Sequence, residues 1–341
     1  MRPAGCRRSS TCSSTPHGSS RERPRPRTAR HDRRTRPEGD RMTDHAVALL
    51  GAGKMGAALV DRWVEAGRPV VVWNRSSAGA EALVRDGVTA AATIPEAVQG
   101  LPVVVTSLTD GPALTSVLLD QGGLAALAPG TTLVDLSTVD VASSEAVAAA
   151  AQERGIAYVR GAVSGSPLVV RSGSASLLLS GPADAVEAAR EVLSEVAPAH
   201  HVLGEGEQAR VVKIAVNSML GATMQLLAEA TVLVEAAGVE RDAFLDALDG
   251  TVMASRFVSY KGAALRARDY AATFRTADMR KDLDLAVSLG EQGSIPLPVA
   301  SAVLARLEEA VAAGYADDDF LALVCVQQAA AGRPVDLHRE P

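Results

Sequence analysis

Cysteine is scarce in this sequence, and so are unbroken apolar runs. Only three cysteines occur, and Cys325 is the only one beyond the first 41 residues, which excludes a disulfide framework and predicts a reducing compartment. The most apolar helical stretch is interrupted by Lys213, Glu229 and Glu235, so no segment reaches the roughly 20 apolar residues that cross a bilayer. No His or Cys pair has metal-ligand spacing on one element. We therefore expect a cytoplasmic protein with no membrane contact and no metal.

The first 41 residues have a composition of their own. They hold 12 Arg and no Lys against four acids, a local charge of 12 − 4 = +8, whereas the remaining 300 residues carry 22 − 36 = −14. With almost nothing apolar to bury, residues 1–41 are predicted to be a disordered Arg-rich extension. The pattern matches no specific nucleic-acid-binding motif. Our simplest expectation is that translation begins at Met42 and that the extension has no role.

From His45 to about Gly204, short β-branched runs alternate with Ala-rich helical stretches, beginning with VALLGAG and KMGAALVDRWVEAG. Strands that alternate with helices of ten or more residues are typical of parallel pairing through right-handed crossovers. The later runs IAYVRGAVSG and SASLLLSG are expected to continue the pattern, and a helix is expected from about Ala78 to Arg85. The sequence predicts an α/β Rossmann-like, doubly wound sheet over residues 42–205.

After Gly204 the strand pattern stops, and only helical patterns follow. The first runs for some thirty residues to a C-terminal glycine, Gly238, and would be about 45 Å long at 1.5 Å per residue. We predict an all-helical substrate and oligomerisation domain over residues 206–333, followed by a tail at 334–341. A helix of that length commonly contributes to subunit contacts, so a homodimer or homotetramer is expected.

The hexapeptide GAGKMG follows the first expected strand and opens the first expected helix. It fits G-x-G-x-x-G, in which glycines permit a tight turn and let a pyrophosphate approach a helix N-terminus. In this context the motif predicts a dinucleotide site. The cofactor-binding candidates here are Gly51, Gly53, Lys54, Met55 and Gly56.

The end of the second expected strand indicates which dinucleotide binds. NAD enzymes usually place an acid there for the ribose 2′-hydroxyl, but this chain has WNRSS, with Asn74, Arg75 and Ser76. A guanidinium and a hydroxyl suit a 2′-phosphate. NADP(H) is therefore predicted in preference to NAD(H).

In the long helix, Lys213 and Asn217 are four residues apart and share one face with small or apolar neighbours. A partly desolvated lysine has its pKa lowered from about 10.4 toward the range that is useful for proton transfer. The alternative is a lysine with a buried stem and a head that reaches water. Spacing alone leaves both open.

From about Ala46 to Gly332 the chain resembles the β-hydroxyacid dehydrogenases. This family includes 3-hydroxyisobutyrate dehydrogenase and the glyoxylate/succinic semialdehyde reductases, and its NAD(P)-binding domain is of the 6-phosphogluconate dehydrogenase type. The resemblance rests on motifs in the family's order: GAGKMG, DLST at 135–138, VSGSP at 163–167, KIAVN at 213–217 and KDLDLA at 281–286. It implies an NADP(H)-dependent oxidoreductase that interconverts a short β-hydroxyacid and its semialdehyde or keto form.

The resemblance also implies roles for individual residues. Lys213 would be the general acid/base, and Asn217 would orient the substrate. Ser164, Gly165 and Ser166 would hold the acid substrate's carboxylate, and Ser137, next to Thr138, would also contact the substrate. Leu108, Thr109, Thr138 and Lys281 would contact the cofactor, while Asp282 would brace its own helix.

Some positions depart from the family pattern. Ser166 stands where a second glycine is usual, Val141 where proline is usual, and Thr109 follows Leu108 where proline is frequent. Arg160 precedes the serine loop, and we expect it to cap a strand. Imine reductases, the first alternative, share the domain plan and the N-R-[ST] sequence but usually lack the lysine. A second alternative, a non-catalytic dinucleotide-binding relative, would also tend to lose it.

Overall fold

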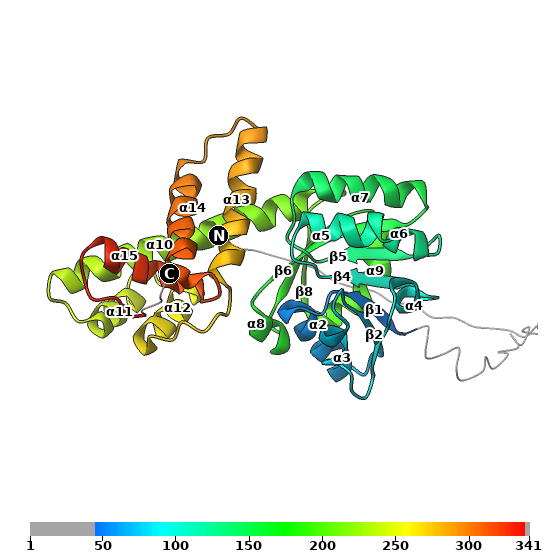
Figure 1. The fold of residues 1–341 in the computed structure, drawn as a ribbon, viewed down its shortest axis with the longest axis horizontal. Helices are drawn as coiled ribbons and strands as arrows, with labels where there is room; N and C mark the ends of the chain where they lie inside the picture. Colours follow the sequence, from blue (N-terminus) through cyan, green and yellow to red (C-terminus); the bar gives the residue numbers. More distant parts are fainter. Residues whose placement is uncertain (1–44, 338–341) are drawn as a thin grey trace, which may run out of the picture. The chain divides into compact units, whose positions relative to one another are not determined.

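The computed structural model describes residues 45–337, all within the unit Glu38–Pro341. The Arg-rich extension predicted at 1–41, and the last four residues of the predicted tail, lie outside the described residues. Figure 1 shows an α/β part followed by a helical part.

Eight strands form a single sheet in the order β3-β2-β1-β4-β5-β6-β7-β8. Every neighbouring pair is parallel except β6 with β7, and the predicted α/β doubly wound class is confirmed. The strands are β1 (Val47–Leu50), β2 (Val70–Trp73), β3 (Val88–Ala90), β4 (Val103–Thr106), β5 (Thr132–Asp135), β6 (Ala157–Ser164), β7 (Ser176–Ser180) and β8 (Ala199–Val202).

The antiparallel pair departs from the continuous parallel pattern that the sequence predicts. In this pair, Arg160 lies opposite Ser180, and Ser164 lies opposite Ser176. Only 176 − 164 − 1 = 11 residues connect the strands, and they include the five-residue helix α8 (Pro167–Arg171). A parallel crossover needs a dozen or more residues, so this connection returns the chain antiparallel.

Alternating side chains give the sheet two apolar faces. Val47 and Leu49 of β1 belong to one buried cluster, while Ala48 and Leu50 belong to the cluster on the other face. The first face is covered by α2 (Lys54–Glu65), α3 (Ser77–Glu81), α8 and α9 (Ala183–Val196). The second is covered by α4 (Ile94–Val98), α5 (Gly111–Thr115), the π-helical turn η1 (Ser116–Asp120), α6 (Gly123–Ala126) and α7 (Val141–Glu153).

Helix α3 is shorter than the sequence predicts. It ends at Glu81 rather than Arg85, because the chain turns there and Arg85 forms an isolated bridge with Val88 at the start of β3. The turn places Arg85 against Asp61 of α2, with 2.5 Å between their charged groups.

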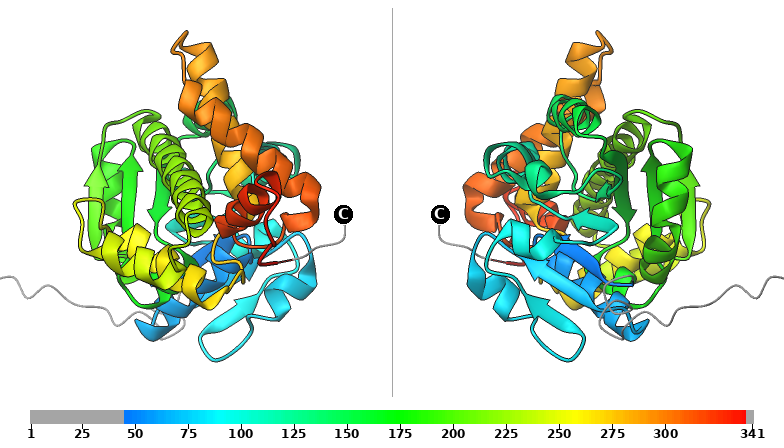
Figure 2. Two further views of the ribbon diagram at one scale, coloured as in Figure 1. Left: turned by 90° about the vertical axis from the view of Figure 1, so that its left-hand side faces the viewer. Right: turned by 90° about the vertical axis from the view of Figure 1, so that its right-hand side faces the viewer.

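The first helix of the helical part, α10 (Gln208–Ala236), links it to the sheet. It packs on β6 and β7, where Ala209 joins a small cluster with Ala162 and Leu178. It also packs on α13 (Thr276–Gln292) and α15 (Leu323–Ala330) (Figure 2). Gly238 follows with φ +83°, confirming the predicted C-terminal glycine. The other elements are α11 (Arg241–Asp249), α12 (Arg256–Ala267), α13 (Thr276–Gln292), α14 (Pro298–Ala310), the turns η2 (Val311–Tyr315) and η3 (Phe320–Ala322), and α15 (Leu323–Ala330).

By length and composition alone, α10 could cross a membrane. Within the protein α10 packs on β6 and β7 and on other helices, and 39% of the apolar window is buried.

The segment after Arg333, predicted as the start of a tail, packs on the helical core as far as it is described. Asp336 accepts hydrogen bonds from Arg241 at 2.6 Å and Tyr270 at 2.9 Å, and Leu337 accepts one from Tyr315 through its carbonyl. The helical domain therefore includes residues up to Leu337.

Candidate active site

The glycine-rich loop lies where the chain leaves β1 and enters α2, next to β4. Gly51 has φ +116°, and a Cβ there would lie 2.2 Å from the Ser107 carbonyl oxygen. A Cβ on Gly56 would lie 2.1 Å from the Gly51 carbonyl oxygen. Gly53, the N-cap of α2, instead faces open space, because its Cβ would meet nothing within 4 Å. Two glycines thus permit the close turn, and the third leaves a gap over the helix N-terminus that fits a pyrophosphate.

The loop is tied to the end of β2 by Asn74. Its Oδ1 accepts a hydrogen bond from the Ala52 amide at 3.0 Å, and its Nδ2 donates to the Ser76 carbonyl at 3.0 Å. Both side-chain groups of Asn74 are therefore occupied in shaping the turn. Arg75 and Ser76 are exposed. Together with Ser77, which is also exposed, they are the residues of WNRSS that remain available to a ligand at this edge.

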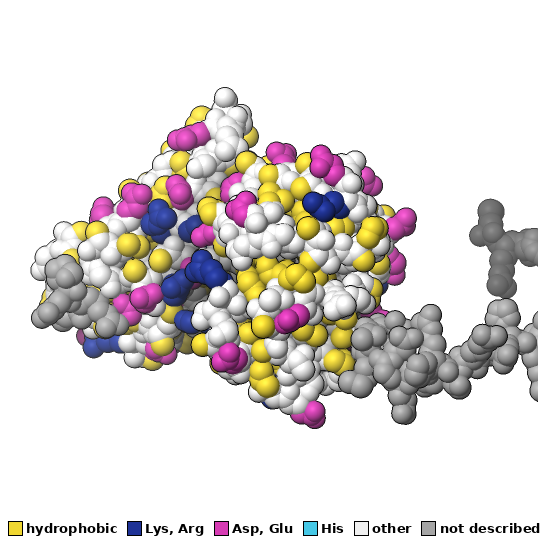
Figure 3. Space-filling view, turned by 45° about the vertical axis from the view of Figure 1, so that its right-hand side comes forward, with side chains coloured by type: hydrophobic (Ala, Val, Ile, Leu, Met, Phe, Trp, Pro, Cys, Tyr) yellow, Lys and Arg dark blue, Asp and Glu magenta, His cyan; other side chains and the backbone are white. Residues whose placement is uncertain are grey.

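A basic pocket of about 410 Å³ opens beside the glycine loop. Gly53 and Lys54 line it together with Ser166 and Arg171, and Thr273 contributes from the helical domain. Met55, predicted with this group, is half-buried and packs against the sheet cluster. In the space-filling view, Lys and Arg side chains gather near the middle of the drawn face (Figure 3).

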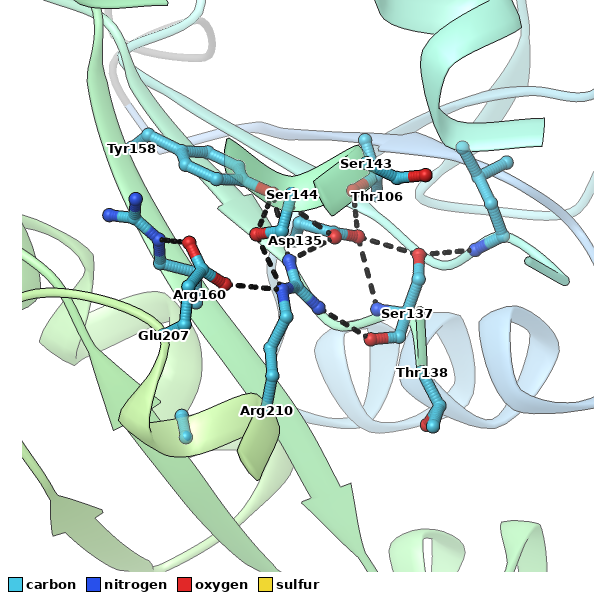
Figure 4. A network of polar contacts seen from close by, with 12 residues as sticks. Thr106, Asp135, Ser137, Thr138, Ser143, Ser144, Tyr158, Arg160, Glu207 and Arg210 are labelled. Carbon is cyan, nitrogen blue, oxygen red and sulfur yellow. Dashed lines mark hydrogen bonds and ion pairs between the residues drawn. The ribbon is translucent and has the colours of Figure 1, made fainter. Parts of the chain in front are cut away.

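The ends of β4 and β5 are joined by Ser137 (Figure 4). Its hydroxyl accepts a hydrogen bond from the Leu108 amide at 2.8 Å and donates one to Asp135 at 2.5 Å. Ser137 is 3% exposed, so its hydroxyl shapes the loop rather than pointing into open space. Thr138 beside it is half-buried, and Thr109 is exposed. Ser137 was predicted to bind substrate. In the structure its hydroxyl links the end of β4 to the end of β5.

Lys213 lies on α10 facing this strand end, in a small cleft that Ser137 and Thr138 also line. Burial lowers the pKa of the Lys213 ammonium from its ordinary 10.5, against the opposing effect of Asp282, and Lys281 lowers it further. A lysine with a lowered pKa gives up its proton more readily than an exposed lysine, which suits a group that both donates and accepts a proton.

Asn217 lies one turn beyond Lys213 and is 1% exposed. Its Nδ2 donates to Asp282 at 2.5 Å, whereas its Oδ1 has no hydrogen-bond partner among residues 45–337. A buried acceptor without a partner is costly, unless a ligand group supplies the missing donor. The Asn217–Asp282 pair thus leaves the Oδ1 atom of Asn217 free, one helical turn from Lys213.

Helix α13 brings two charged residues to the same place. Lys281 donates to the Thr138 carbonyl at 2.7 Å and forms an ion pair with Asp282 at 2.8 Å. The resemblance implied that Asp282 braces this helix, and Asp282 joins it to α10 by accepting a hydrogen bond from Asn217. The two residues are 65 positions apart, and the K-D pair at the head of KDLDLA was the only sequence signal of this contact.

The serine loop follows β6. Ser164 is the last residue of that strand, and Gly165 has φ +146°. Ser166 is the N-cap of α8 and accepts a long hydrogen bond of 3.4 Å from the Val169 amide. Its hydroxyl is therefore only weakly held by the protein.

We expected from the sequence that Arg160 caps a strand, and this prediction is wrong. Arg160 lies within β6, and its Nε donates to Glu207 at 2.7 Å, immediately before α10. Arg210 is a residue that sequence reasoning missed altogether. It is 2% exposed and binds Asp135 at 2.5 Å, and its only sequence signal was an arginine on the apolar face one turn before Lys213.

Within residues 45–337, no group of three or more His, Cys, Asp or Glu side chains could hold a metal ion. His200 contacts the Ala197 carbonyl at 3.0 Å on the edge strand β8, and His45 lies 3.8 Å from Glu191. His338 lies outside the described residues.

Two family models cover most of the chain. Residues 46–204 match the NAD binding domain of 6-phosphogluconate dehydrogenase, and residues 207–326 match the NAD-binding domain of NADP-dependent 3-hydroxyisobutyrate dehydrogenase. The chain is 30% identical to glyoxylate/succinic semialdehyde reductase 1 of Arabidopsis thaliana, over 82% of this chain and 96% of that protein. It is also 30% identical to the NAD-dependent L-serine dehydrogenase of Pseudomonas aeruginosa, over 80% and 95% respectively.

Solved structures agree with these matches. The 3-hydroxyisobutyrate dehydrogenase of Mycobacterium tuberculosis, solved with L-serine, superposes with a TM-score of 0.76 at 27% identity, over 82% of this chain and 98% of that chain. A reductive aminase of Aspergillus terreus, in complex with NADPH and ethyl levulinate, gives 0.56 at 25% identity, over 83% and 99%. With the dinucleotide loop and the lysine cleft in place, these matches show that the chain is an oxidoreductase of the β-hydroxyacid dehydrogenase family, which includes the 3-hydroxyisobutyrate dehydrogenases and glyoxylate reductases.

Proposed function

We propose that this protein interconverts a short β-hydroxyacid and its semialdehyde or keto form, with NADP(H) as the redox partner and Lys213 as general acid/base. The observation that carries the proposal is the half-buried Lys213, whose pKa is lowered by burial, beside the unpaired Oδ1 of Asn217. The nicotinamide cofactor, when bound, supplies or accepts the hydride.

The protonation state of Lys213 determines whether the residue assists reduction or oxidation. As an ammonium it donates a proton to the carbonyl oxygen of the aldehyde or ketone during reduction. As a neutral amine it takes the hydroxyl proton during oxidation. Asn217, held through its Nδ2 by Asp282, keeps its Oδ1 available to a substrate hydroxyl. The two residues thus divide proton transfer and orientation between them.

The acid end of the substrate is assigned to the loop at Ser164, Gly165 and Ser166. The positive φ of Gly165 shapes a turn in which main-chain N–H groups can face an anion. The weak cap made by Ser166 leaves its hydroxyl able to turn toward a carboxylate.

NADP(H) is proposed over NAD(H) because Arg75 and Ser76 are exposed at the end of β2, where an acid would be expected for NAD. Arg75 supplies a charge-assisted hydrogen bond to a 2′-phosphate.

Imine reduction is the second candidate function, favoured by the superposition on the reductive aminase. The experiment that separates the two is oxidation of NADPH, with NADH in parallel, against glyoxylate, short acid semialdehydes and cyclic imines. Turnover of a short semialdehyde acid with NADPH preferred supports the proposal. Turnover of imines alone contradicts it.

We also propose that the functional unit is a homodimer, joined through α10. Met219, Leu226 and Leu233 are 69%, 61% and 70% exposed, and their spacing of seven places them in one row along the helix. An apolar row with this period is the pattern of a helix–helix seam, and a second copy of the same row would cover it.

The dimer is tested by light scattering on a Leu226→Glu variant. We expect the wild type to have the mass of a dimer and the variant to have that of a monomer. Val84→Glu, at an apolar position of 53% exposure on the α/β part, is the matched control and is expected to remain dimeric. A monomeric wild type would contradict the proposal.

A further inference from the structure

A buried polar cluster joins the start of α10 to the end of β5 (Figure 4). Its centre is the Arg210 guanidinium, which is 2% exposed and lies against Asp135, which is fully buried. Arg210 Nη2 donates to Asp135 Oδ2 at 2.5 Å and to the Tyr158 hydroxyl at 2.8 Å, and Nη1 donates to the Ser137 carbonyl at 2.9 Å. Nε donates to Ser144 at 2.6 Å.

The partners of Arg210 come from separate elements. Asp135 and Ser137 lie at the end of β5, Ser144 lies on α7, and Tyr158 lies on β6. Glu207, just before α10, adds an ion pair with Nε at 3.2 Å. A planar guanidinium that donates from all three of its nitrogens allows very little rotation or translation of the helix that carries it.

The same strand end is held again one residue later. Lys281 of α13 donates to the Thr138 carbonyl, so two successive carbonyls, of Ser137 and Thr138, accept from cations on two different helices. Lys213 follows Arg210 by three residues and therefore lies one turn along on a neighbouring face. The contacts of Arg210 and of Lys281 with the Ser137–Thr138 segment thus together fix the distance from Lys213 to that segment.

We infer that Arg210 is a positioning residue, which locks the helix carrying Lys213 against the Ser137–Thr138 segment so that the lysine reaches the reacting carbonyl. The inference rests on the proposed role of Lys213 as proton donor. Arg210 lines the Lys213 cleft, but each of its three guanidinium nitrogens donates to a protein group, so Arg210 acts on the reaction through the position of the helix. Because misplacing a reacting group by about 1 Å can cost on the order of a hundredfold in rate, loosening this lock lowers kcat.

The test is an Arg210→Lys variant, which keeps the charge beside Asp135 but loses the fork. Arg241→Lys is the matched control, because Arg241 is also a buried arginine, paired with Asp336 and with Glu235 at the far end of α10. Two properties are measured on each full-length protein: amide hydrogen exchange by peptide mass spectrometry, and the pH dependence of kcat with its KM.

For Arg210→Lys we expect faster exchange in peptides covering Ser137–Thr138 and the start of α10, kcat lower by on the order of a hundredfold, and NADPH affinity within about twofold of wild type. The pKa seen in the pH profile and assigned to Lys213 rises toward 10.5. The reason is that water enters around the Lys213 ammonium and around the two charged groups that face it, Lys281 and Asp282 of α13. Arg241→Lys is expected to lose stability, with kcat, the pH limb and local exchange at Ser137–Thr138 unchanged.

The inference is overturned if Arg210→Lys exchanges at Ser137–Thr138 as the wild type does, or if it loosens this segment while kcat and the pH limb stay unchanged. Should Arg210→Lys fail to fold, the variant Arg210→Met/Asp135→Asn removes both buried charges together, and the same exchange and kinetic outcomes apply. Failure of the proposed function shows differently, as a wild type without semialdehyde turnover, and the exchange result stands independently of it.

Discussion

Two alanine substitutions in the glycine loop should separate cofactor affinity from stability: Gly53→Ala weakens NADPH binding, and Gly56→Ala lowers the free energy of unfolding. In Gly53→Ala the new Cβ meets nothing within 4 Å. Loss of a glycine N-cap costs up to about 1 kcal/mol, and the lower entropy of the unfolded chain returns about 0.4–1 kcal/mol. The free energy of unfolding of the apoprotein should therefore change by less than about 1 kcal/mol.

In Gly56→Ala the Cβ would lie 2.1 Å from the Gly51 carbonyl oxygen, where ordinary contact begins near 3.4 Å, so the backbone must move by 3.4 − 2.1 = 1.3 Å. Overpacking of this kind costs about 1–3 kcal/mol, and the two backbones leave no side chain to move aside. Alanine's better helix propensity returns about 1 kcal/mol. We expect a net loss of up to about 2 kcal/mol.

The assays are urea unfolding without ligand and titration of NADPH fluorescence. Gly53→Ala should bind NADPH at least tenfold more weakly, about 1.4 kcal/mol, because its methyl group occupies the space assigned to the pyrophosphate. For Gly56→Ala the main effect should be a lower free energy of unfolding, measured without ligand. Wild-type NADPH affinity in Gly53→Ala would refute the placement of the cofactor on this loop, whatever the stability of either variant.

Three further predictions concern charge. The lowered pKa of Lys213 predicts that the oxidation rate rises, and the reduction rate falls, as pH increases through a value below 10.5; pH profiles in both directions check this, and a shared limb at or above 10.5 would be inconsistent with it. Lys261→Met should lower the free energy of unfolding by about 3–5 kcal/mol, because Asp319, paired with it at 2.5 Å and 2% exposed, loses its cation; urea unfolding measures this, and a loss under about 1 kcal/mol would mean that Asp319 finds other compensation. Arg75→Ala should weaken NADPH binding by about 10- to 100-fold and leave NADH binding unchanged, as expected for one charge-assisted hydrogen bond worth about 1.5–3 kcal/mol; equal losses for both cofactors would place Arg75 elsewhere.

Local rules explain what the sequence predicted well. GAGKMG lies at a strand-to-helix turn because its glycines are needed within that turn, and Gly238 ends α10 because a positive φ is cheap only for glycine. Helical spacing singled out Lys213 and Asn217, and the family resemblance added their roles. In the structure, Lys281 and Asp282 of α13 lie close enough to act on the charge of Lys213, and Asp282 accepts a hydrogen bond from Asn217.

Features that depend on distant segments were missed. The antiparallel return of β7 depends on the length of the connection after Ser164, which the strand patterns do not reveal. The engagement of the Ser137 hydroxyl depends on the Leu108 amide of the neighbouring strand end. Arg210 appeared only as an arginine on an apolar helix, since its partners come from three other elements.

The central claim is that Lys213 transfers the proton, and the most direct measurement is turnover of a Lys213→Met variant with an accepted semialdehyde, alongside its affinity for NADPH. Methionine keeps the length of the side chain without a titratable group. The account predicts NADPH affinity close to wild type and kcat lower by about 10²- to 10⁴-fold, with loss of the pH limb. A variant that binds NADPH normally and keeps most of its turnover would contradict it.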